Sequence, residues 1–161
     1  MNWPDPILGL ENQSLGAHGE PTLGRALRLS IDDWEAGNRD REFRLHLLFL
    51  AWYCNLEPPH LTGYEEAAYP SAQLSDLFST VYETFSDTIL DDVEALYVVG
   101  LIAQLTPYLL GGDEEIWEAR SRSFRARYRK LAPGGLTPST FRDRGAFGDY
   151  FACQVQVPGG F

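Results

Sequence analysis

The sequence lacks lysine and arginine between Arg44 and Arg120, although thirteen aspartates and glutamates fall in that stretch. Basic residues then follow close together at Arg120, Arg122, Arg125, Arg127, Arg129 and Lys130. Interspersed signs are the usual solubilising arrangement of surface charge. Separation over such a length predicts either that the basic segment docks on the acidic part of the molecule or that the folded chain attracts a charged partner.

The sequence also lacks the short motifs that mark common active sites. It contains no Gly-x-x-x-x-Gly-Lys, no Cys-x-x-Cys, no His-Glu-x-x-His and no Gly-x-Ser-x-Gly. Its three histidines, His18, His46 and His60, are far apart in the sequence and are expected in a lead-in, a buried helix and a loop. We therefore predict no cofactor and no metal ion, and we favour a protein without enzymatic activity.

Cysteines and long apolar runs are scarce as well. Cys54 and Cys153 each stand among apolar residues, which predicts two small buried hydrophobic side chains and no redox pair. The most apolar stretch, 45–54, is about half the length that a membrane-spanning helix needs. The first residues show no basic segment followed by an apolar one, as a signal peptide would. These features predict a cytoplasmic protein without a membrane segment.

A net charge of −10 limits the possible partners. It repels phosphate over most of the surface, so nucleic-acid binding would depend on residues 120–130 alone, and we do not expect it. An acidic surface suits a basic protein, including an enzyme that normally binds nucleic acid. The length of 161 residues and the hydrophobic share of 44% predict a single helical domain, with an irregular lead-in over 1–22 and an extended tail over 151–161.

Hydrophobic periodicity predicts an all-α fold. Apolar residues recur at three- and four-residue spacing over 74–90, and the chain is apolar nearly all round over 47–54, which is typical of a central helix covered on every side. Capping residues, prolines and glycines separate the elements. We expect an irregular bundle of five or six helices in antiparallel pairs. The clearest predicted helices cover 39–56, 74–90, 92–110, 114–131 and about 138–150.

The sequence of two segments also allows a minor β accessory of two strands. Residues 23–34 suit one helical face, which we favour, but 27–31 also alternate as a strand does. Ser30 and Asp33 resemble a capping box that would begin a new helix at residue 31. Apolar residues also alternate over 151–157, so the two segments can pair if both are extended.

The basic segment 114–131 carries an aromatic stripe on one helical face, with a row of arginines beside it. The stripe contains Trp117, Phe124, Tyr128 and Leu131; Arg122, Arg125 and Arg129 flank it on one side, and Arg120 and Arg127 on the other. Such a strip fits an apolar groove with an acidic rim, which is either part of the protein itself or part of a partner. The acidic row suited to an internal rim is Asp76, Glu83 and Asp87.

These patterns predict a protein–protein interaction module with an acidic surface, such as an inhibitor or immunity-type protein that offers carboxylates to a basic partner. The candidate partner-binding residues are the strip, its arginines and the acidic row. Homodimerisation through the strip or the tail is a further possibility.

The alternative is a small-molecule or metal-binding protein, or an enzyme, that uses the loop 57–66. This loop gathers Glu57, His60, Tyr64 and Glu65 on a segment stiffened by two prolines. Glu57 and His60 have the Glu-x-x-His spacing of di-iron bundles, but the prolines between them exclude the continuous helix that this motif needs. A lone histidine beside acids is more often a hydrogen-bonding residue than a base.

Overall fold

The computed structural model describes residues 5–161, and this part of the chain is all-helical, as the periodicity predicts. None of the described residues forms a strand. The α-helices are α1 (Asp5–Gln13), α2 (Leu23–Glu35), α3 (Arg41–Leu56), α4 (Pro59–Thr62), α5 (Ser71–Glu83), α6 (Val93–Leu105), α7 (Glu114–Leu131) and α8 (Gly145–Gln154). Short 3-10 helices cover Ile89–Asp91, Pro107–Leu109 and Pro138–Phe141.

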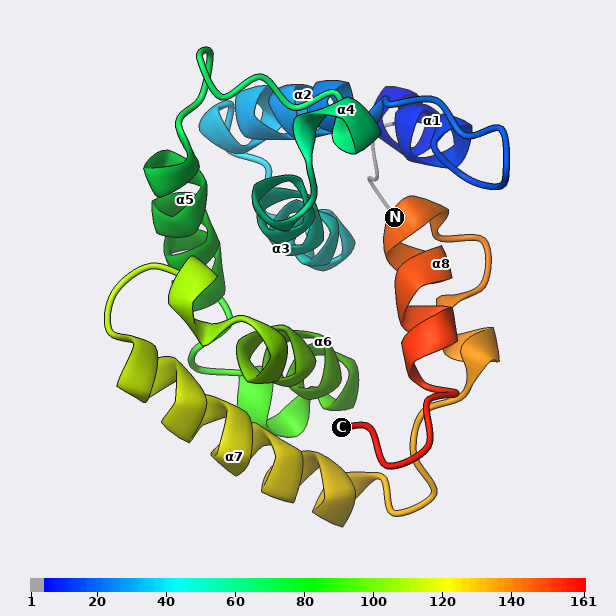
Figure 1. The fold of residues 1–161 in the computed structure, drawn as a ribbon. Coiled ribbons are helices and arrows are strands. Elements are labelled where there is room, and N and C mark those ends of the chain that lie inside the picture. Colours follow the sequence, from blue (N-terminus) through cyan, green and yellow to red (C-terminus); the bar gives the residue numbers. More distant parts are fainter. Residues whose placement is uncertain (1–4) are drawn as a thin grey trace.

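Helix α3 lies at the centre of the molecule (Figure 1). Helices α2, α5, α6 and α8 contact it, α7 packs on the outer side of α6, and α1 lies against α2 and α8. The apolar run of the sequence therefore lies where the core requires a helix that is covered on every side. Its fully buried side chains include Leu45, Leu47, Leu48, Phe49 and Leu50.

Aspartate caps set where three of these helices begin. The carboxylates of Asp40, Asp92 and Asp113 accept hydrogen bonds of 2.9–3.4 Å from backbone N–H groups in the first turns of α3, α6 and α7. These N–H groups have no partner within their own helix, so a capping carboxylate typically stabilises a helix by about 1 kcal/mol.

Helix α1 occupies a segment where the sequence predicts an irregular lead-in. Residues 1–4 of that predicted lead-in lie outside the described residues, but 5–13 are helical. Glycine and proline in this region indicate weak helical propensity. Ile7 and Leu10 nevertheless bury their side chains in the core. Tertiary packing of this apolar face outweighs the local preference.

Helix α8 likewise extends into the predicted extended tail and ends only at Gln154. Phe147 and Phe151, one helical turn apart, are both fully buried, so the helical period overrides the alternation of apolar residues over 151–157. Cys153 is exposed on this helix, contrary to the prediction that it is buried. Cys54 is buried as predicted.

Helix α2 is continuous over 23–34, the segment for which the sequence allowed either a helix or a strand. The hydroxyl of Ser30 donates a hydrogen bond of 2.8 Å to the carbonyl of Ala26, four residues earlier. Ser30 therefore sits inside the helix and does not cap a new one. With residues 27–31 and 151–154 both helical, the two-stranded accessory does not form in the described part of the chain.

The loop after α3 lies directly on α2 at a contact between two glycines. A Cβ added to Gly24 would lie 2.4 Å from the carbonyl oxygen of Gly63. Gly63 itself has a φ of 72°, a left-handed conformation that favours glycine. This close approach fixes the segment 63–69 against α2.

We expect Gly24→Ala to destabilise the protein by about 1–3 kcal/mol, because the added methyl group would force backbone apart. Alanine in a helix otherwise stabilises by about 1 kcal/mol relative to glycine. Gly9→Ala in α1 is the matched control, since a Cβ there would have nothing within 4 Å, and it should be stabilising. Urea unfolding measures both changes. A similar gain in stability from both substitutions would contradict the proposed contact.

Candidate interaction surface

The aromatic stripe of α7 faces the interior of the molecule. Trp117, Phe124 and Tyr128 are only 1%, 5% and 5% exposed. The ring of Trp117 lies edge-to-face with that of Tyr82 at 4.9 Å, and its indole N–H donates a hydrogen bond of 2.6 Å to the carbonyl of Gly111. The groove that the stripe fills is therefore part of this chain. These three side chains are not available to a partner while α7 is docked.

Two arginines of α7 pair with carboxylates of the same molecule. Arg120 lies 3.9 Å from Glu83, and Arg127 lies 2.9 Å from Asp91. Both carboxylates are largely exposed, so each pair contributes at most about 1 kcal/mol. The basic segment thus docks on the acidic part of the chain, mainly through its aromatic face.

The other basic residues of α7 differ in their surroundings. Arg122 and Arg129 are exposed and form no ion pair with any residue in 5–161. Arg125 is partly buried and turns towards the segment that follows α8, where it donates a hydrogen bond to the backbone carbonyl of Gly160. Of the arginine row predicted from the sequence, two members therefore remain available at the surface.

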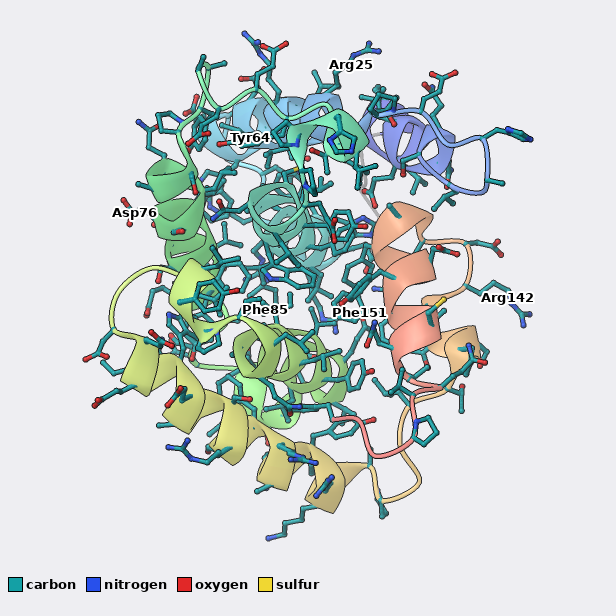
Figure 2. The ribbon with its side chains drawn as sticks, in the orientation of Figure 1. Arg25, Tyr64, Asp76, Phe85, Arg142 and Phe151 are labelled. Atoms are coloured by element: carbon teal, nitrogen blue, oxygen red, sulfur yellow. The ribbon has the colours of Figure 1, made fainter. Side chains whose placement is uncertain are left out.

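Helix α5 and the beginning of α7 lie on the same side of the molecule (Figure 1). The hydroxyl of Ser79 in α5 donates a hydrogen bond of 3.0 Å to the carbonyl of Leu110, four residues before α7 begins. Asp76 points away from the body (Figure 2). We define the α5–α7 acidic face as the exposed residues Asp76 and Glu83 of α5, Asp87 in the turn after α5, and Glu114, Glu115 and Glu118 of α7.

Most of the α5–α7 acidic face has no counter-charge. Glu83 is near Arg120, but the other members form no ion pair within the described residues. Exposed apolar side chains stand on adjoining segments: Tyr108 is 63% exposed in the 3-10 helix that packs on α7, and Ile116 is 50% exposed in the first turn of α7. Apolar side chains beside a charged rim are typical of protein interfaces.

The loop 57–66 does not bring its four candidate residues into one site. Glu57 caps the end of α3, and His60 is exposed on α4. Tyr64 is buried, and its hydroxyl donates a hydrogen bond to the carbonyl of Tyr69. Burial raises the pKa of Tyr64 to about 12. Within residues 5–161, no three histidine, cysteine or acidic side chains are grouped as a metal site requires.

Tyr64 and Glu65 do line a common hollow of about 300 Å³ between α2 and the segment 63–69. Leu27 and Ile31 contribute apolar surface to it. Arg25, at its edge, points away from the body (Figure 2). The charged residues of the lining are Arg25, Arg28, Asp32, Glu35 and Glu65.

A buried charge network joins helices far apart in the sequence, and the sequence analysis did not identify it. His46 Nδ1 is 2.7 Å from Glu11 Oε2, and His46 Nε2 is 3.1 Å from Glu42 Oε1. Glu42 also accepts two hydrogen bonds from Arg144, which reaches Glu94 at 2.6 Å. The network ties α1, α3 and α6 to the beginning of α8. Glu11 and His46 are 0% and 1% exposed, so a substrate cannot reach them in this arrangement.

Opposing effects set the protonation of this network. Burial lowers the pKa of His46, but the neighbouring carboxylates of Glu11 and Glu42 outweigh burial and raise it. Burial raises the pKa of Glu42, but the hydrogen bonds from His46 and Arg144 outweigh it and lower the pKa to about 2. The charged forms of both groups therefore stabilise the folded protein.

We expect the contribution of this network to the unfolding free energy to be greatest between about pH 5 and pH 6.5. The folded pKa of His46 is raised, so its contribution is complete below its unfolded pKa and is lost as pH rises through the folded value. The folded pKa of Glu42 is lowered, so its contribution is lost as pH falls from 4.5 towards 2. Urea unfolding from pH 2 to pH 9 tests this.

His46→Gln is the informative variant for this profile. It should be less stable at pH 6 by about 3 kcal/mol, because Glu11 would lose its buried counter-charge. It should also lose most of the decline in stability above pH 6.5. The same decline in the variant and the wild type would contradict the assignment to His46.

Comparisons with known proteins give no functional information, because no family model, curated protein or solved structure matches the chain. Among the described helices, none combines the length and the apolar character needed to cross a bilayer. Functional inference therefore depends on the charge and geometry of the surface.

Proposed function

We propose that the chain is a cytoplasmic, non-enzymatic protein–protein interaction module that binds a basic partner through the α5–α7 acidic face. The observation that supports this most directly is that, among the described residues, every member of that face except Glu83 lacks an ion-pair partner. The molecule carries a net charge of −10, and Arg120, the arginine that pairs with Glu83, lies over the rings of Tyr82 and Trp117. The uncompensated field attracts a cationic surface and speeds its association.

The chemistry of the face favours a folded protein as partner. Carboxylates repel the phosphates of a nucleic acid, and a simple cation would make no use of Tyr108 and Ile116. A protein surface that presents lysine and arginine around an apolar contact uses both features. An inhibitor or immunity-type protein that covers the basic substrate site of an enzyme is a specific form of this proposal.

Removing carboxylates from the face should weaken the complex. In the variant Asp76→Asn, Asp87→Asn, Glu118→Gln, we expect at least a tenfold loss of affinity, because several interfacial charge contacts disappear together. The partner is first captured from the native lysate with the wild-type protein and identified by mass spectrometry. Its Kd is then measured by calorimetry, and it should rise with salt concentration.

The matched control removes three exposed carboxylates elsewhere, in Glu20→Gln, Glu66→Gln, Asp149→Asn. Its net charge equals that of the face variant, but its affinity should stay near the wild-type value. Equal losses in both variants, or a Kd independent of salt, would show that the face does not direct recognition. Charge reversal of Arg122 and Arg129 should not weaken binding.

A second candidate is a small-molecule or metal-binding protein, or an enzyme, that uses residues of the loop 57–66. The hollow of about 300 Å³ between α2 and the segment 63–69 favours it, because Tyr64 and Glu65 line this hollow together with Arg25 and Arg28. This volume is at the lower end of the range for ligand pockets. The polar groups at its edge suit a small molecule with charges of both signs.

Filling this hollow should abolish binding of any ligand it holds. Ala68 lines the hollow, whereas the neighbouring exposed Ala67 does not, so Ala68→Trp and Ala67→Trp form a matched pair. In saturation-transfer NMR with a metabolite mixture, we expect a binder to be seen with the wild type and Ala67→Trp but not with Ala68→Trp. The absence of any binder to the wild type would remove this candidate.

A further inference from the structure

The segment 155–161 leaves α8 and turns back towards α6 (Figure 1). We call it the strap. Val157 in its middle is 51% exposed, but Phe161 is only 7% exposed. The strap is therefore held mainly by one aromatic ring.

The ring of Phe161 fills a slot whose floor is Gly100 of α6. A Cβ added to Gly100 would lie 2.1 Å from Cζ of Phe161, so the ring occupies the space of a missing side chain. Tyr97 and Tyr128 form the walls, with ring centroids 5.8 and 5.7 Å from that of Phe161. The hydroxyl of Ser121 donates to the carbonyl of Gly100 at 2.9 Å and joins α7 to the floor. The slot thus has the shape of a phenyl ring.

Polar contacts hold the strap weakly. Its backbone hydrogen bonds are local turns, and within residues 5–161 the one hydrogen bond to a distant part of the chain runs from Arg125 Nη2 to the carbonyl of Gly160 at 3.4 Å. Gly159 has a φ of 68°, a conformation that favours glycine and makes this point of the strap a suitable hinge. Release of the ring would therefore cost few other interactions.

Near the slot lie a hydrogen-bond donor without a partner in residues 5–161 and a hollow that the strap does not fill. Arg125 Nε is buried and has no hydrogen-bond partner among the described residues, which is costly unless an acceptor reaches it. A hollow of about 320 Å³ lies beside Phe161, lined in part by Arg129 and Gln154. A longer or bulkier peptide segment than the strap would find space in this hollow, with Arg129 and Gln154 as polar side chains beside it.

We propose that the slot formed by Gly100, Tyr97 and Tyr128 is a recognition site for an aromatic side chain, and that Phe161 is its exchangeable occupant in cis. The partner is a polypeptide segment whose aromatic ring enters the slot and whose backbone carbonyl accepts from Arg125. The slot is distinct from the α5–α7 acidic face, and this inference does not depend on the function proposed for that face.

The site is tested by emptying the slot and offering the ring in trans. In the Phe161→Ala variant, acetyl-Pro-Gly-Gly-Phe-amide should bind saturably and shift the ring signals of Tyr97 and Tyr128 in NMR spectra. Its Kd should be at least tenfold lower than for the wild type, where Phe161 competes. The peptide with alanine in place of phenylalanine should not bind.

Gly100→Ala is the control that closes the slot. The double variant Gly100→Ala, Phe161→Ala should not bind the peptide, because the methyl group takes the place of the ring. Equal binding to both Phe161→Ala proteins, or none to the single variant, would overturn the proposal.

A second measurement keeps the test decisive if Phe161→Ala folds poorly. Gly100→Ala should lower the Tm of the wild type, because the added methyl group expels Phe161. It should not lower the Tm of a Phe161→Leu protein, because the smaller leucine side chain can shift within the slot. A drop in Tm of the same size in both backgrounds would show that Gly100 and the Phe161 ring are not coupled, and the slot assignment would fail.

Discussion

The structure depends on the burial of α3 on every side. A helix with apolar residues all round has no face to offer to water, so other elements must enclose it. Four helices contact it directly, and both α1 and α8 are needed to close the side that the middle of the chain leaves open. His46 places a polar ring in this covered helix and therefore needs buried partners. Glu11 and Glu42 supply them, so the same enclosure that excludes water also fixes where the ends of the chain dock.

Lysine and arginine are scarce in this protein, and the positions at which they form ion pairs determine which surface carboxylates stay unpaired. Thirteen lysines and arginines face twenty-three aspartates and glutamates. Arg41 and Arg144 serve the carboxylates around α3 and α6, while Arg120 and Arg127 stay with the inner side of α7. Apart from Glu83, the carboxylates of the α5–α7 acidic face have no ion-pair partner among the described residues. The face stays negative because most of the ion-paired arginines serve other carboxylates, and the exposed Arg122 and Arg129 form no ion pair within residues 5–161.

The sequence predicted those parts of the fold that depend on neighbouring residues. The periodicity of 74–90 and the apolar run of 45–54 locate α5 and α3, although α5 ends at Glu83 and a separate 3-10 helix covers Ile89–Asp91. Features that depend on distant residues were missed. The carboxylate of Glu11 contacts His46, which is thirty-five positions away, and Arg144 contacts Glu42 across 102 positions, so no local sequence pattern predicts either pair.

For the same reason Glu57 and His60 were wrongly grouped with Tyr64, because residues that are close in sequence within a loop need not direct their side chains to one point. The stripe of α7 was read correctly, but only packing decides whether its groove is internal.

The inward docking of that stripe strengthens the case for the acidic face. With Trp117 and Phe124 turned to the core, the acidic first turn of α7 faces outward beside α5, and the exposed arginines lie farther along the helix. Glu114 and Glu115 stand at the positive end of the helix dipole, which stabilises their charge without an intramolecular cation. A folded protein can therefore maintain this face unpaired at little cost in stability. Apart from Glu83, the carboxylates of this face then retain their capacity to pair with a partner without the loss of an internal ion pair.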